Sequence, residues 1–231
     1  MAVNFVRLLS SALKRRGFCS LSGKDKSRDA LAQLRVERDP ERVIDICCSA
    51  GLTPESHRDR IAFFKAVTRL REANDAEGIR RFIGDSMDRL GGSVSERAAS
   101  HFMVLFGKGG LVSDAVKMFD EMPEMGIERN IKTLNSLLFS CVLAGDYGEM
   151  KRIFMEFPRK YGLDPNLETY NIVLRGFCES GNANSAHSLF AEMERKRIKP
   201  TRSTFALAIA GFYREEKFTD VGKMTTLMKK Y

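Results

Sequence analysis

The chain has 231 residues, 43 % of them hydrophobic, and its 38 Lys and Arg against 30 Asp and Glu give a formal net charge of +8. It contains no apolar run of the roughly 18 residues that a membrane-spanning helix requires, so we predict no membrane association. Trp is absent and Pro is sparse, which disfavours a β-sandwich or a barrel.

The N-terminal segment is basic and contains no acid before Asp25. Apolar residues recur at helical spacing over Val3–Leu13, with serines between them. This pattern is typical of an organelle transit peptide, and Arg16-Gly-Phe18 before Cys19 resembles a plant mitochondrial processing site. We therefore predict a mitochondrial transit peptide over residues 1–18, with the chloroplast as the alternative destination. A basic tail without a targeting role is the other interpretation.

The next part of the chain alternates helical segments with turn signals. Asp39-Pro40 marks a helix start, because Asp is a good cap and Pro is tolerated in the first turn, and Gly51 marks its end. Helical pairs with a blurred signature follow, amounting to about one and a half repeats. The predicted parts are a leader and first helix over 19–37, and degenerate helical repeats over 38–95 that include helices over 41–50, 55–71 and 75–90.

From residue 96 onward a unit of 35 or 36 residues recurs. A helical apolar pattern begins three times at a glycine, and a second pattern in phase with it begins three times at a threonine. Neither helix of a unit can bury its apolar face alone, so this period predicts an all-α protein, a right-handed α-solenoid of stacked antiparallel helix pairs. The predicted units cover 96–130, 131–166, 167–201 and, as a partial fourth, 202–231.

The unit over 167–201 carries the residues of a known repeat. They are Thr169-Tyr170-Asn171 and Gly176-Phe177-Cys178 in the first helix, Gly181 in the turn, and Leu189-Phe190 with Glu192-Met193 in the second helix. This unit resembles a pentatricopeptide repeat of the P type. The tetratricopeptide repeat fits less well, because its Trp or Leu-Gly-x-x-Tyr core is missing. The front end, over 38–63, is also similar to plant pentatricopeptide repeat proteins of the mitochondrial small ribosomal subunit.

The resemblance implies binding of single-stranded RNA along the first helices. In the family, the fifth and last residues of a unit meet one base. The family pattern implies adenine for the first such pair in this chain and a pyrimidine for the second, whereas the third pair is ambiguous. Carried onto this chain, the base-contacting residues are Ser100, Asn130, Asn135, Asn166, Asn171 and Thr201.

The second residues of the units depart from the family, which places Val or Ile there. They are Arg97, Lys132, Glu168 and Ser203. A charged residue cannot pack on a base as an aliphatic one does, so we expect Arg97 and Lys132 to meet phosphate and Glu168 to repel it. This departure favours contact with a folded RNA backbone, as in a ribosome. For Asn135 and Asn171, helix capping and turn chemistry is the alternative interpretation.

The sequence shows no motif for catalysis or for a cofactor. The three histidines are scattered, and no C-x-x-C pair with zinc spacing occurs. We therefore predict a protein that is not an enzyme, with no metal, no cofactor and no small-molecule substrate. The leading hypothesis is an RNA-binding subunit of the mitochondrial small ribosomal subunit, with ribosomal or messenger RNA and mitochondrial ribosomal proteins as partners. The alternatives are a free factor that binds one transcript for its stability or translation, and a protein-binding scaffold.

Overall fold

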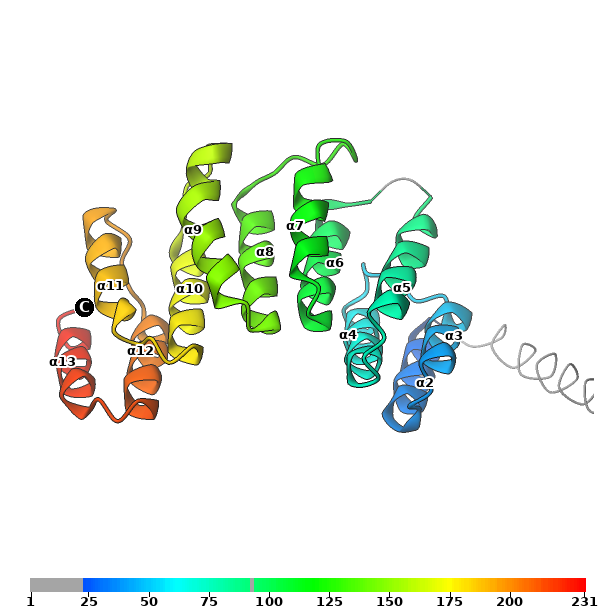
Figure 1. The fold of residues 1–231 in the computed structure, drawn as a ribbon, viewed down its shortest axis with the longest axis horizontal. Helices are drawn as coiled ribbons and strands as arrows, with labels where there is room; N and C mark the ends of the chain where they lie inside the picture. Colours follow the sequence, from blue (N-terminus) through cyan, green and yellow to red (C-terminus); the bar gives the residue numbers. More distant parts are fainter. Residues whose placement is uncertain (1–22, 92–93) are drawn as a thin grey trace, which may run out of the picture.

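The computed structural model describes residues 23–91 and 94–231, so the predicted transit peptide lies outside the described residues. In this part of the chain all regular structure is helical, and the helices lie side by side in chain order along the long axis of the molecule (Figure 1). They are α2 (Gly23–Val36), α3 (Pro40–Ala50), α4 (His57–Glu72), α5 (Ala76–Asp88), α6 (Glu96–Gly109), α7 (Val112–Glu121), α8 (Ile131–Ala144), α9 (Tyr147–Tyr161), α10 (Leu167–Glu179), α11 (Ser185–Arg195), α12 (Arg202–Arg214) and α13 (Phe218–Met228).

The even-numbered helices form one layer and are called first helices below; the odd-numbered ones are second helices. Consecutive first helices pack on one another from α2 to α12, and each also packs on the second helix that follows it. Each second helix buries its apolar stripe against this layer, as Ala115, Met118 and Phe119 do in α7. The predicted α-solenoid of stacked helix pairs is therefore confirmed.

The N-terminal part contains two helix pairs, α2 with α3 and α4 with α5. α2 lies within the stretch 19–37, for which the sequence predicts a leader and a first helix, and it packs on both α3 and α4. Asp39 caps α3 by accepting a hydrogen bond from the Glu41 backbone N–H, with Pro40 in the first turn. Gly51 ends this helix with a φ of 61°, a left-handed conformation that favours glycine.

The first helices approach closely because small residues lie where they meet. A Cβ added at Gly107 in α6 would lie 2.4 Å from the backbone of Ser140 in α8. A Cβ at Gly211 in α12 would lie 2.2 Å from Sγ of Cys178 in α10. This spacing sets the positions of the first helices, and therefore the spacing of any residues that they present to a ligand.

Candidate RNA interface

The first turns of α6 and α8 carry two of the predicted phosphate contacts. Arg97 is the second residue of α6 and Lys132 the second residue of α8, and both side chains are exposed. Glu96 is the acid in the first turn of α6, whereas α8 has no acid in its first turn. The two cations therefore extend from neighbouring helix starts on the layer of first helices.

The predicted last residues of the units are the N-terminal caps of the next first helices. The side-chain oxygen of Asn130 accepts hydrogen bonds from the backbone N–H groups of Lys132 and Thr133 at 2.9 and 3.1 Å. Asn166 and Thr201 occupy the same place before α10 and α12. Capping is their first role in the fold, because the first N–H groups of a helix have no partner within it.

Asn135 lies in the interior and is fully engaged with the next unit. Its side chain is 3 % exposed. Its amide nitrogen donates to Oδ1 of Asn166 at 3.3 Å and to Oε2 of Glu168 at 3.2 Å. Its oxygen accepts a bond from the Thr169 hydroxyl at 2.7 Å. The structure thus brings the predicted pair Asn135 and Asn166 together, but in a bond to each other.

Asn171 has the same position in the next unit, but its side chain makes fewer hydrogen bonds than that of Asn135. It is half-buried, and its side-chain oxygen accepts a 2.8 Å hydrogen bond from the hydroxyl of Thr204. This bond leaves the amide N–H₂ group as a donor for a ligand. Ser100, the equivalent residue of the first unit, is also half-buried, whereas Ala206 of the last unit is exposed and has no polar side-chain atom.

Sequence reasoning missed the threonines that link the units. Thr133, Thr169 and Thr204 are fully buried, each in the first turn of its first helix. Their hydroxyls complete the helix caps, and those of Thr169 and Thr204 also bond the asparagine of the preceding unit. The recurrence of threonine at one register position was visible in the sequence and is the signal that could have found them.

Glu168 has a second role in the structure besides the repulsion of phosphate expected of it. This exposed carboxylate accepts the hydrogen bond from the Asn135 amide. Glu96 does the same in the preceding unit, where the Asn130 amide donates to it at 2.8 Å. Both carboxylates therefore also hold the polar network between units in place.

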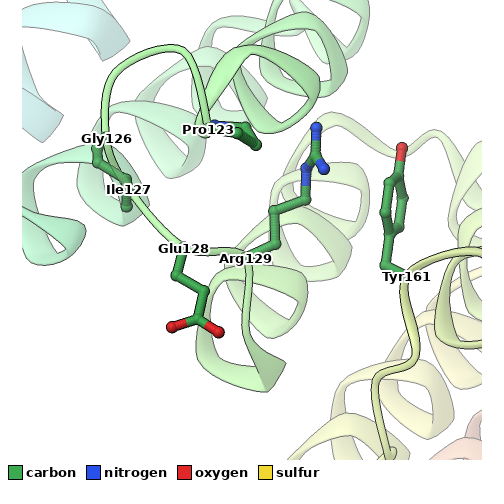
Figure 2. Close-up of a pocket in the computed structure, with 6 residues that line it drawn as sticks. All are labelled: Pro123, Gly126, Ile127, Glu128, Arg129 and Tyr161. Carbon is green, nitrogen blue, oxygen red and sulfur yellow. The ribbon is translucent and has the colours of Figure 1, made fainter.

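A shallow cavity of about 420 Å³ lies at the loop between α7 and α8 (Figure 2). The Arg129 side chain is fixed there, because it donates to the backbone oxygens of Phe119 and Asp120 at 3.0 and 2.6 Å. Its guanidinium lies 4.6 Å from the centre of the Tyr161 ring at the end of α9. These contacts join two units, and the cavity contains none of the predicted site residues.

The described residues show little reactive chemistry. Burial raises the pKa of the Cys47 and Cys141 thiols to about 12 and that of Cys178 to about 11, so these thiols stay protonated. Within residues 23–91 and 94–231, no group of three or more His, Cys, Asp or Glu side chains is placed to hold a metal ion. No helix in the same ranges has the length and apolarity to cross a membrane.

The fold and its recurring first-helix residues define a helical-repeat protein that presents polar groups at regular spacing. Three family models match this chain: the PPR repeat family over 165–214, the pentatricopeptide repeat domain over 117–180 and the PPR repeat over 100–127. The chain belongs to the pentatricopeptide repeat family, and its units are of the P type.

Two relatives from Arabidopsis thaliana illustrate the similarity. A mitochondrial pentatricopeptide repeat-containing protein is 39 % identical over 226 residues, which are 97 % of this chain and 56 % of the relative. The small ribosomal subunit protein mS79 is 30 % identical over 163 residues, which are 71 % of this chain and 41 % of the relative. The chain thus spans about half the length of the curated relatives it matches.

A solved structure shows the same fold. PPR10 in complex with an 18-nt psaJ RNA element matches with a TM-score of 0.60 at 18 % sequence identity. The match covers 98 % of this chain and 33 % of PPR10. At this identity the likeness concerns the arrangement of the helices alone.

Proposed function

We propose that the layer of first helices binds RNA, and that it does so mainly through the phosphate backbone. The observation that carries this proposal is the pair of exposed cations, Arg97 and Lys132, at the same register position of successive first helices. Phosphates are bound by such side chains without regard to base sequence. The complex of PPR10 with RNA supports the choice of ligand, since it has the same fold.

Base readout is the smaller part of this proposal. To read a base, Asn135 would have to give up hydrogen bonds to Asn166, Glu168 and Thr169, and a buried polar group that loses its partners costs about 1–3 kcal/mol. Asn171 keeps an amide donor available and is the better candidate for a base contact. Ser100, with Asn130 and Thr201 at the unit boundaries, completes the proposed contact surface.

The proposed setting is the mitochondrial small ribosomal subunit, where the protein would contact RNA and ribosomal proteins without catalysing a reaction. The similarity to mS79, and to mS78 at 27 % identity over 180 residues, supports this setting. The name of the relative at 39 % identity supports the mitochondrion over the chloroplast. A free factor that binds a single transcript is the second candidate, favoured by the amide donor of Asn171. The protein-binding scaffold predicted from the sequence remains the third.

Salt-dependent RNA binding tests the contact surface. Replacing Arg97 and Lys132 together by Ala should weaken binding to two unrelated RNAs alike and lower the log–log salt slope by about 0.7 for each lost single-strand phosphate. Asn171→Ala should leave the slope unchanged and alter preference for one base. Lys151→Ala is the matched control, because this exposed cation lies on the second helix α9. Unchanged affinity and slope in the double variant would refute the proposed surface.

Sedimentation of the tagged protein from an organelle extract tests the setting. We expect it to move with the small ribosomal subunit and to be released by ribonuclease. A light particle that depends on RNA would instead identify the free factor. A complex that is insensitive to ribonuclease and contains no RNA would identify a protein-binding scaffold.

A further inference from the structure

The corner between α11 and α12 concentrates positive charge. Residues 195–202 contain five cations and no acid, and all five side chains are exposed. None of them has an ion pair within the described part of the chain, whereas Arg152 on the preceding second helix is paired with Glu149 and Glu156 at 2.5 and 2.9 Å. The corner consists of Arg195, Lys196, Arg197, Lys199 and Arg202.

One of these cations occupies a backbone position that favours glycine. Arg197 has a φ of 57°, in the left-handed region, and the turn is closed by bonds from its N–H to the Glu194 oxygen and from Ile198 to Met193. The corresponding turns of the two preceding units use Gly126 and Gly162, with φ of 73° and 64°. A side chain in this conformation is destabilising relative to glycine. Arg197 therefore occupies a backbone conformation in which glycine would be more stable.

We propose that this corner, named the α11–α12 corner, binds the phosphates of RNA and extends the contact from the start of α12 to the end of α11. The inference rests on the proposed RNA-binding function. Unpaired cations are attracted to any polyanion, and phosphate contacts of this kind position an RNA without reading its bases, so the corner fits the RNA backbone. α12 begins beside them with no acid in its first turn, which adds the positive end of its dipole.

Arg197→Gly separates a binding role from a structural one. Because glycine relieves the left-handed conformation, the variant should melt about 1–4 °C higher than the parent. The same variant should bind RNA more weakly, with a log–log salt slope lower by about 0.7–0.9. A structural role alone would change stability without changing the slope.

Glu216→Gly is the matched control for this substitution. Glu216 also has a φ of 57° and is exposed, and the three preceding units place Gly110, Gly145 and Gly181 at the same register position. The control should gain stability in the same way, while its RNA affinity stays no lower than that of the parent. A drop in affinity in this control equal to that of Arg197→Gly would overturn the proposal, because backbone relief and not charge would then explain it.

A triple variant, Lys196→Ala with Arg197→Gly and Lys199→Ala, measures the whole corner in the 231-residue chain. The probes are a polyuridine single strand and a GC-rich RNA duplex. The RNA for which the variant loses more of the log–log salt slope is the form whose phosphates the corner binds. Unchanged affinity and slope on both probes would overturn the proposal. If the corner variant leaves the slope unchanged while the Arg97 and Lys132 double variant lowers it in the same assay, only the corner inference fails. If the corner variant alone loses slope, the first-helix surface fails instead.

Discussion

At the scale of single residues, His101 in α6 has a buried side-chain nitrogen, Nε2, that the described part of the chain leaves without a hydrogen-bond partner. The ring meets Phe63 edge-on, with centroids 6.0 Å apart. Burial lowers the pKa of His101 to about 4, and the nearby charge of Arg60 acts in the same direction. The imidazole is therefore neutral in the folded protein at neutral pH.

This histidine predicts a loss of stability on mild acidification. Between its unfolded pKa near 6.5 and its folded pKa near 4, the unfolded chain binds a proton that the folded chain does not, so stability falls as pH falls through this window. We expect His101 to contribute about 2 kcal/mol of this loss between pH 7 and pH 5. Urea unfolding at both pH values checks it, with His101→Phe as the variant that should lose that part of the dependence. An equal loss in parent and variant would contradict the assignment.

The hydrogen bonds of the candidate site residues could not be predicted from the sequence. The register of the repeat singled out Asn135 and Asn166, which are hydrogen-bonded to each other in the structure. Their mutual hydrogen bond, and the bond from Thr169, depend on how the neighbouring first helix is placed. That placement is set by packing between units and is absent from the pattern of any one unit. The base-reading role implied for Asn135 by the family resemblance stays a prediction.

At the scale of elements, contact between first helices depends on small side chains. A Cβ at Gly107 would lie 2.4 Å from both the Cα and the backbone oxygen of Ser140, which cannot move as a flexible side chain can. Gly84 in α5 provides the contrast, because a Cβ there has no neighbour within 4 Å. Two glycines inside helices of the same chain therefore differ only in what surrounds them.

Alanine at these two positions should have opposite effects. Gly107→Ala should destabilise the protein by about 1–3 kcal/mol, because α6 and α8 must separate to accept the methyl group. Gly84→Ala should stabilise it by about 0.5–1 kcal/mol, because alanine loses less backbone entropy in a helix. Chemical denaturation of the two variants measures both. Stabilisation by Gly107→Ala would show that the two helices do not approach as closely as described.

Helix starts and ends were mostly readable from local chemistry, and the exceptions have a physical cause. Pro40 and Gly51 mark the start and the end of α3 in both the sequence and the structure. α9 does not end where its local chemistry suggests. It continues through Pro158, a residue that usually ends a helix, to Tyr161, and it is longer than the other second helices. The rings of Phe157 and Tyr161 pack on Phe119 of α7, and this tertiary contact holds the extra turn.

At the scale of the whole molecule, stability is a sum over neighbours. Each unit buries its apolar faces only against the units beside it, so a local defect is expected to weaken adjacent units more than distant ones. The period of 35 or 36 residues was sufficient to predict this architecture, because a solenoid needs only a repeated helix pair. The two N-terminal pairs pack as the later units do, although their sequence carries only a blurred form of the repeat signature.

Phe190 is the residue that best tests this picture. It lies in α11, is 7 % exposed, and stacks on Phe205 of α12 with ring centroids 5.1 Å apart. Phe190→Ala should cost about 3–5 kcal/mol, since a large buried ring is replaced by a cavity. Because Phe205 belongs to the next unit, the loss should extend to α12 and α13 and spare α4 and α6. Hydrogen exchange resolved by segment measures this distribution directly.

The control for Phe190→Ala is Met155→Ala in α9, whose side chain is 59 % exposed. Its stability should stay within about 0.5 kcal/mol of the parent. An unchanged melting midpoint for Phe190→Ala would show that the apolar face of α11 is assigned incorrectly. A uniform loss of protection from α4 to α13 would show instead that the stack unfolds as one cooperative block. The nearest-neighbour description would then have to be abandoned, although the fold itself would stand.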